Sequence, residues 1–123
     1  GTPLVWTVYL GGHSECSQAV GVRTNRGTAL ITSDDVYHYR FLEEGVMARL
    51  HVTPGLLVSA TDRLVGLAER EGAVLVPLHD PEVWKAVESA GENWLDVLRP
   101  LSRKAVEGYR ARRGSLKLLG GNP

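Results

Sequence analysis

Cysteine is almost absent from this sequence. Cys16 is the only one among 123 residues, so no disulfide can form within the chain. The sequence also lacks a signal-peptide pattern and any apolar run long enough to span a membrane. An excess of either charge is missing too, because Lys and Arg number 14 and Asp and Glu number 14. We therefore expect a cytoplasmic protein that binds neither nucleic acid nor a membrane.

What is present fits one globular domain over residues 1–123. The length is sufficient to bury a core, and 43% of the residues are hydrophobic while 23% are charged. The one basic cluster, Arg110 with Arg112 and Arg113, falls where a last helix would end, a position that favours cations.

The first third of the chain alternates apolar and polar residues, as strands with one buried face do. The alternation predicts strands over 5–10 and 19–24 and a returning strand over 28–32. Asn25-Arg26-Gly27 has the composition of a hairpin turn. This part is therefore predicted to be antiparallel β structure.

A helical period begins after His51. Thr53 can cap this helix, Pro54 suits its first turn, and Gly72 is placed to end it. The predicted apolar stripe comprises Leu57, Ala60, Leu64, Leu67 and Ala68. The short apolar run over 73–76 that follows is typical of a strand covered on both faces.

Two more helices are predicted after this strand. Asp80 is placed to cap the first and Pro81 to open it. Its buried side chains are expected to be Trp84, Val87 and Ala90.

The second helix covers 92–113, interrupted or kinked near Pro100, and the tail over 118–123 is expected to be loose. The order of elements is then three strands, a helix, a strand and two helices. That order predicts a layered α/β or α+β domain.

Three polar residues each follow a predicted strand: His13, Asp34 and His79. Loops beyond strand ends are where α/β proteins tend to build ligand sites, and two imidazoles with a carboxylate suit zinc or a similar divalent ion. Taken singly, each histidine also fits a structural or solvated role. Asp34 and Asp35 likewise fit an ordinary turn.

The order and approximate spacing of GGHS at His13, TSDDVY at Asp34 and LHDPEVW at His79 resemble the second half of the metallo-β-lactamase superfamily. The resemblance covers about residues 5–87 and is closest to the N-acyl homoserine lactone lactonase branch. Tyr37, three residues after Asp34, is part of the pattern.

The resemblance implies a dinuclear site with two divalent metal ions, expected to be zinc. His13 would complete the first metal site, Asp34 would bridge both metals, and His79 would complete the second. Tyr37 would hydrogen-bond the substrate carbonyl or the leaving oxygen. Asp80 could orient His79 from behind, although capping a helix is an equal alternative for it.

The sequence also departs from the family. It lacks the HxHxDH motif of the first half, and Glu15-Cys16 stand where Pro-Gly is usual. Cys16 is interpreted as a small buried hydrophobe, with a ligand role as the alternative. The segment over 91–123 is an extra helical extension that could cover the site or make a subunit contact.

The resemblance therefore implies the C-terminal half of a metallo-β-lactamase αββα sandwich, whose partner is an N-terminal-half chain or segment carrying HxHxDH. The expected function is zinc-dependent hydrolysis of a lactone or related ester-like bond, the chemistry of quorum-quenching lactonases. Thioesters, β-lactams and cyclic amides are alternative substrates. A non-catalytic α/β interaction subunit is the other reading, and an oligomer is possible.

Overall fold

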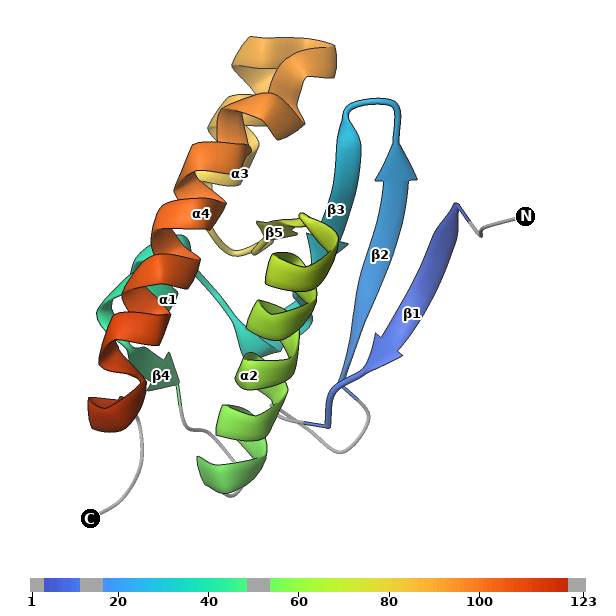
Figure 1. The fold of residues 1–123 in the computed structure, drawn as a ribbon. Coiled ribbons are helices and arrows are strands. Elements are labelled where there is room, and N and C mark those ends of the chain that lie inside the picture. Colours follow the sequence, from blue (N-terminus) through green and yellow to red (C-terminus); the bar gives the residue numbers. More distant parts are fainter. Residues whose placement is uncertain (1–3, 12–16, 49–53, 120–123) are drawn as a thin grey trace.

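A computed structural model of the chain describes residues 4–11, 17–48 and 54–119 (Figure 1). The strands are β1 (Val5–Tyr9), β2 (Gln18–Thr24), β3 (Gly27–Ile31), β4 (Val46–Ala48), β5 (Val74–Val76) and β6 (Lys117–Leu119). The α-helices are α1 (Tyr39–Glu44), α2 (Pro54–Glu71), α3 (Pro81–Ala90) and α4 (Trp94–Arg112). Single turns of 3₁₀ helix are η1 (Ser33–Asp35), η2 (Gly91–Asn93) and η3 (Arg113–Ser115).

The main sheet has four strands in the order β1-β2-β3-β5. β1, β2 and β3 pair antiparallel, as the alternating pattern predicts, whereas β5 pairs parallel to β3 with Leu30 opposite Leu75. β4 and β6 form a second, two-stranded parallel sheet. The α/β class is therefore confirmed, with a mixed sheet rather than a purely antiparallel one.

Helices close the β5 edge of the main sheet. β5 is buried along its whole length, as its apolar run predicts. The amide and carbonyl of Leu75 face away from β3 and are taken by two side chains. Its N–H donates to Ser102 Oγ of α4 at 2.9 Å, and its carbonyl accepts a hydrogen bond from the Tyr39 hydroxyl of α1. This edge needs no further strand because both backbone groups are satisfied.

The predicted stripe of α2 is confirmed. Leu57, Ala60, Leu64 and Ala68 are buried and Leu67 is half-buried, at the spacing of one helix face. Gly72 follows α2 with a φ of +63°, a left-handed conformation that favours glycine at a helix end. The predicted cap, Thr53, lies outside the described residues.

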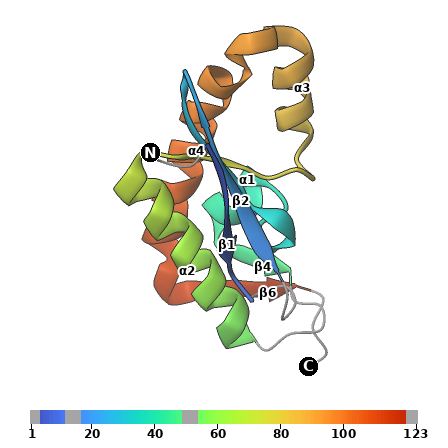
Figure 2. The ribbon, with the colours of Figure 1, turned by 90° about the vertical axis from the view of Figure 1, so that its right-hand side faces the viewer.

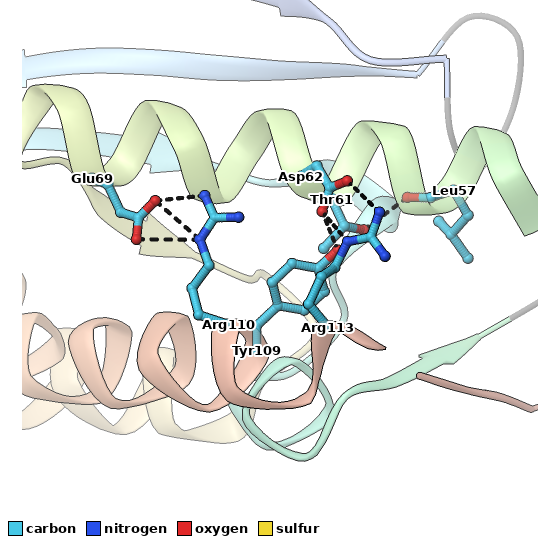
Figure 3. Close-up of polar contacts among 7 residues, drawn as sticks. All are labelled: Leu57, Thr61, Asp62, Glu69, Tyr109, Arg110 and Arg113. Atoms are coloured by element: carbon cyan, nitrogen blue, oxygen red, sulfur yellow. Dashed lines mark hydrogen bonds and ion pairs between the residues drawn. The ribbon is translucent and has the colours of Figure 1, made fainter. Parts of the chain in front are cut away.

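Polar contacts join α2 to α4 along their exposed side (Figure 3). The buried Tyr109 donates its hydroxyl proton to Asp62 Oδ1 at 2.6 Å, and Arg113 contacts both oxygens of that carboxylate at 2.8 and 2.9 Å. Arg110 pairs with Glu69 in the same way. The basic cluster at the end of α4 thus fastens two helices together.

The predicted burial of α3 is wrong. Trp84 is 51% exposed and Val87 is 40% exposed, and the buried face consists of Val83 and Ala86 instead. The indole N–H of Trp84 donates to the Leu78 carbonyl at 2.8 Å, so the ring stays near the turn that precedes α3.

Three further expectations need correction. α4 is one continuous helix from Trp94 to Arg112 with Pro100 inside it, so the predicted interruption is wrong, while the alternative of a kink near Pro100 stays a prediction. Leu118 belongs to β6, which pairs with β4, so this part of the tail is ordered. Between the third strand and α2 the sequence predicted no regular structure, yet α1 and β4 lie there.

One face of the sheet is open at β1. Its alternate residues Val5 and Tyr9 are 62% and 58% exposed, and Thr7 between them is exposed too, whereas Trp6 and Val8 are half-buried. Figure 2 shows the sheet nearly edge-on, with α2 on one side of it and α3 on the other. In the described ranges, no helix has both the length and the apolar character needed to cross a membrane.

Ser102→Ala would leave the buried Leu75 amide without its acceptor. We expect a loss of about 1–3 kcal/mol in the free energy of unfolding, the usual result of orphaning a buried donor. Urea denaturation measures this loss, and amide exchange at Leu75 should accelerate. Ser89→Ala on exposed α3 is the matched control. If both changes lowered the free energy of unfolding equally, the hydrogen bond between Leu75 and Ser102 would contribute no more than an exposed one.

Tyr109→Phe should lower the free energy of unfolding by about 1 kcal/mol at neutral pH, the low end for a hydrogen bond to a partly exposed carboxylate. Arg113, with help from Tyr109, lowers the pKa of Asp62 below its usual value. The stabilisation is therefore complete above the unfolded-state pKa of about 4 and is lost as the pH falls through the folded-state pKa.

The stability difference between wild type and Tyr109→Phe should accordingly narrow on acidification below about pH 4, since Asp62 then loses its charge. Denaturation curves recorded across this range test the expectation. Arg110→Gln, which removes the exposed pair with Glu69 but leaves the hydrogen bonds of Asp62 to Tyr109 and Arg113 in place, is the control and should change stability by no more than about 1 kcal/mol. A pH-independent difference would contradict the role given to Asp62.

Candidate functional site

The carboxyl ends of β1, β3 and β5 lie at the same edge of the main sheet. β1 and β3 both run antiparallel to β2, and β5 runs parallel to β3, so all three point the same way. The three predicted site residues follow these three strands. The topology thus brings the strand ends that precede these residues to one edge, where open α/β sheets commonly bind ligands.

The loop after β1 is described at its two stems. The amides of Leu10 and Gly11 both donate to the Ser17 carbonyl, at 2.9 and 3.1 Å. Gly11 has a φ of +68°, a left-handed conformation that favours glycine, and a Cβ there would lie 2.8 Å from the hydroxyl oxygen of the exposed Tyr9 side chain, which would have to shift. His13 and Cys16 lie outside the described residues, and their roles stay predictions.

The segment after β3 extends the sheet before turning away. The Thr32 amide donates to the Val76 carbonyl at 3.2 Å, and its buried hydroxyl donates to the Val36 carbonyl at 2.9 Å. Ser33 opens η1 with a φ of +60°, an uncommon conformation for a residue with a side chain. Such backbone strain is found most often in turns and at functional sites.

The two acidic residues of η1 stand differently. Asp34 is the middle residue of this turn, and its side chain lies outside the described part of the structure. Asp35 is buried, with 7% of its surface exposed, and lines a small cavity of about 20 Å³ beside Tyr37 and Tyr109. The cavity has room for one water molecule. Asp35 is therefore more than a surface turn residue, which the sequence reading did not anticipate.

Two predicted site residues do meet. The rings of Tyr37 and His79 have their centroids 4.9 Å apart, with 57° between their planes. Tyr37 is half-buried in the segment between η1 and α1, and His79 is exposed in the turn after β5. This contact joins segments far apart in the sequence at the shared sheet edge.

Asp80 is buried and serves as a helix cap. Its Oδ1 accepts the Glu82 amide at 2.9 Å, which confirms the predicted cap of α3. Its Oδ2 accepts the Tyr39 amide at 2.9 Å, a contact that local sequence could not indicate. The proposed orientation of His79 by this carboxylate stays a prediction.

Tyr39, the first residue of α1, lies between Asp80 and β5, which it contacts through hydrogen bonds. The sequence did not single it out. Burial raises the pKa of its hydroxyl above its usual value, and the charge of Asp80 adds to the effect. Tyr39 therefore stays protonated and acts as a hydrogen-bond donor to β5. Its only sequence signal was a place in an aromatic run, which did not separate it from Tyr37.

Whether metal ions could bind at the carboxyl ends of these strands depends on residues outside the described ranges. Among residues 4–11, 17–48 and 54–119, no three side chains of His, Cys, Asp or Glu group closely enough to hold a metal. Because His13 and the Asp34 side chain are outside the description, the predicted ligand set of His13, Asp34 and His79 is neither confirmed nor contradicted. Of these three residues, only His79 has a described side chain, and its imidazole is exposed.

A larger groove of about 310 Å³ lies at the other end of β5, between the end of α2 and α4. Its walls carry Glu69 and Glu107 against Arg99 and Arg103, so its charges balance. No sequence-predicted site residue lines it.

Comparison of the chain with known protein families, with curated proteins and with solved structures finds no match.

Proposed function

We propose that the chain is one half of a zinc-dependent hydrolase similar to the metallo-β-lactamase superfamily, closest to the N-acyl homoserine lactone lactonases. It would act only with an N-terminal-half chain or segment that supplies HxHxDH. The observation that carries the proposal is the contact between Tyr37 and His79, 4.9 Å apart at the carboxyl edge of the sheet. The resemblance assigns both residues to one site.

The sheet topology supports the same reading. The loops of His13, Asp34 and His79 all follow strands that end at this edge. A histidine, a carboxylate and a second histidine at one edge form a donor set that zinc accepts. The chain offers too few ligands for two metals by itself, so the remaining ligands must come from the partner.

Each residue has a defined task in this proposal. His13 and His79 would each complete one metal site and Asp34 would join them, while two bound zinc ions would supply a hydroxide near neutral pH and polarise the substrate carbonyl. The Tyr37 hydroxyl would donate a hydrogen bond to the carbonyl or leaving oxygen, where negative charge develops. The expected substrate is a lactone, with thioesters, β-lactams and cyclic amides as alternatives.

The open sheet face favours a second candidate, a non-catalytic interaction subunit. Val5 and Tyr9 expose large apolar surfaces that a partner chain could cover. Both candidates involve a partner, so partner binding does not separate them. Metal content does.

Metal analysis of the purified chain together with any co-purifying chain tests the hydrolase. We expect about two metal ions per assembled pair, as in dinuclear hydrolases, and a loss of thermal stability on chelation. His79→Ala should remove metal and abolish turnover, whereas His38→Ala, a change at a half-buried histidine outside the predicted site, should do neither. An assembled pair without metal, indifferent to a chelator, would rule out the hydrolase and favour the interaction subunit.

Tyr37→Phe separates transition-state stabilisation from metal binding. We expect unchanged metal content and a kcat lowered by about 100-fold, the usual consequence of losing one donor to a developing oxyanion. Tyr9→Phe, which removes a hydroxyl from an exposed tyrosine of β1 but keeps the apolar ring that would face a partner, is the matched control. Loss of metal in Tyr37→Phe, or an unaltered rate, would show that Tyr37 has a different role.

A further inference from the structure

The segments that carry Tyr37 and His79 are short and meet near one carboxylate. Tyr37 lies two residues before the first residue of α1, and His79 lies immediately before Asp80. The position of each ring therefore depends on how the starts of α1 and α3 are held relative to each other.

Asp80 holds both starts. The carboxylate is 5% exposed, with Oδ1 at 2.9 Å from the Glu82 amide of α3 and Oδ2 at 2.9 Å from the Tyr39 amide of α1. The first turn of a helix has amides without partners inside the helix. One side chain thus provides a partner to an amide of each helix.

The arrangement compensates for what α1 lacks locally. Its N-cap residue, His38, makes no side-chain hydrogen bond to the helix, and α1 has only six residues. A helix this short has little stability of its own. Its cap comes from a residue far along the chain, so the direction in which α1 starts is tied to the turn after β5.

A buried carboxylate is well suited to this task. Hydrogen bonds from backbone amides to a charged acceptor are stronger than neutral ones, and removal of the acceptor would orphan two amides at once. An uncharged amide side chain could accept only through its single oxygen and would present a donor to the other N–H. The bridge therefore requires aspartate rather than asparagine.

We propose that Asp80 is the positioning residue that keeps Tyr37 against His79, by tying the first turn of α1 to the first turn of α3. The catalytic importance of this pair rests on the proposed hydrolase function. The ring contact itself does not, and it can be measured in the chain alone.

The test compares ring-to-ring NOE cross-peaks between Tyr37 and His79 in wild type and in Asp80→Ser. Serine can still cap α3 from the N-cap position, but its shorter side chain does not span to Tyr39. We expect the variant to fold, with the cross-peaks lost and the Tyr39 amide exchanging faster. Glu82→Gln, which changes the exposed carboxylate two residues on, is the matched control and should keep the cross-peaks.

A folded Asp80→Ser variant with unchanged cross-peaks would overturn the proposal. If that variant does not fold, Asp80→Asn replaces it and should lose the cross-peaks too, since asparagine cannot accept from both amides. A measurement on the wild type gives a second test. The wild type should show a through-hydrogen-bond coupling between the Tyr39 amide and the Asp80 carboxyl carbon, and its absence would equally refute the bridge. In an active assembly, Asp80→Ser should lower kcat more than it changes KM. A wild-type assembly without metal would rule out the proposed hydrolase function, but the NOE comparison would still test whether Asp80 positions Tyr37 against His79.

Discussion

The contact on which the rest of the structure depends is made by the backbone of Leu75. Its amide and carbonyl point away from β3, and an open pair of this kind at a sheet edge is a site for unwanted pairing. Ser102 and Tyr39 take both groups. Ser102 thereby fixes α4 along β5, and Tyr39 fixes α1. The start of α1, two residues after Tyr37, is thereby positioned against β5.

Ion pairs on the protein surface also hold α4 against its neighbouring helices. α4 and the turn after it are rich in basic residues, and three of these pair with acidic residues of other helices: Lys104 with Glu43, Arg110 with Glu69, and Arg113 with Asp62. These exposed pairs contribute little each. Tyr109, which belongs to the core and donates to Asp62, connects one of these pairs to the core. The zero net charge of the sequence thus conceals an electrostatic match between α4 and the helices it packs on.

The candidate site combines a rigid support with exposed chemistry. Asp80 and Tyr39 are buried and bonded, whereas His79 is open to solvent and Tyr37 is half-buried beside it. Functional sites commonly show this arrangement, in which buried and hydrogen-bonded residues support more exposed ones. The open face at β1, with Val5 and Tyr9, is a surface that a partner could cover. The proposed hydrolase and the alternative interaction subunit would both use it.

Local pattern determined much of this protein. Alternation set β1, β2 and β3, the apolar stripe set α2, the short apolar run set β5, and Asp80-Pro81 set the start of α3. That each predicted site residue follows a strand also came from the sequence, and the assignment of Tyr37 and His79 to one site was implied by resemblance alone. Only the tertiary structure decided the rest. α1 takes its cap from Asp80 and its packing from α4, β4 exists because it pairs with β6, and Trp84 is exposed because Val83 and Ala86 meet the core. These features depend on contacts between residues far apart in the chain, which a local period cannot encode.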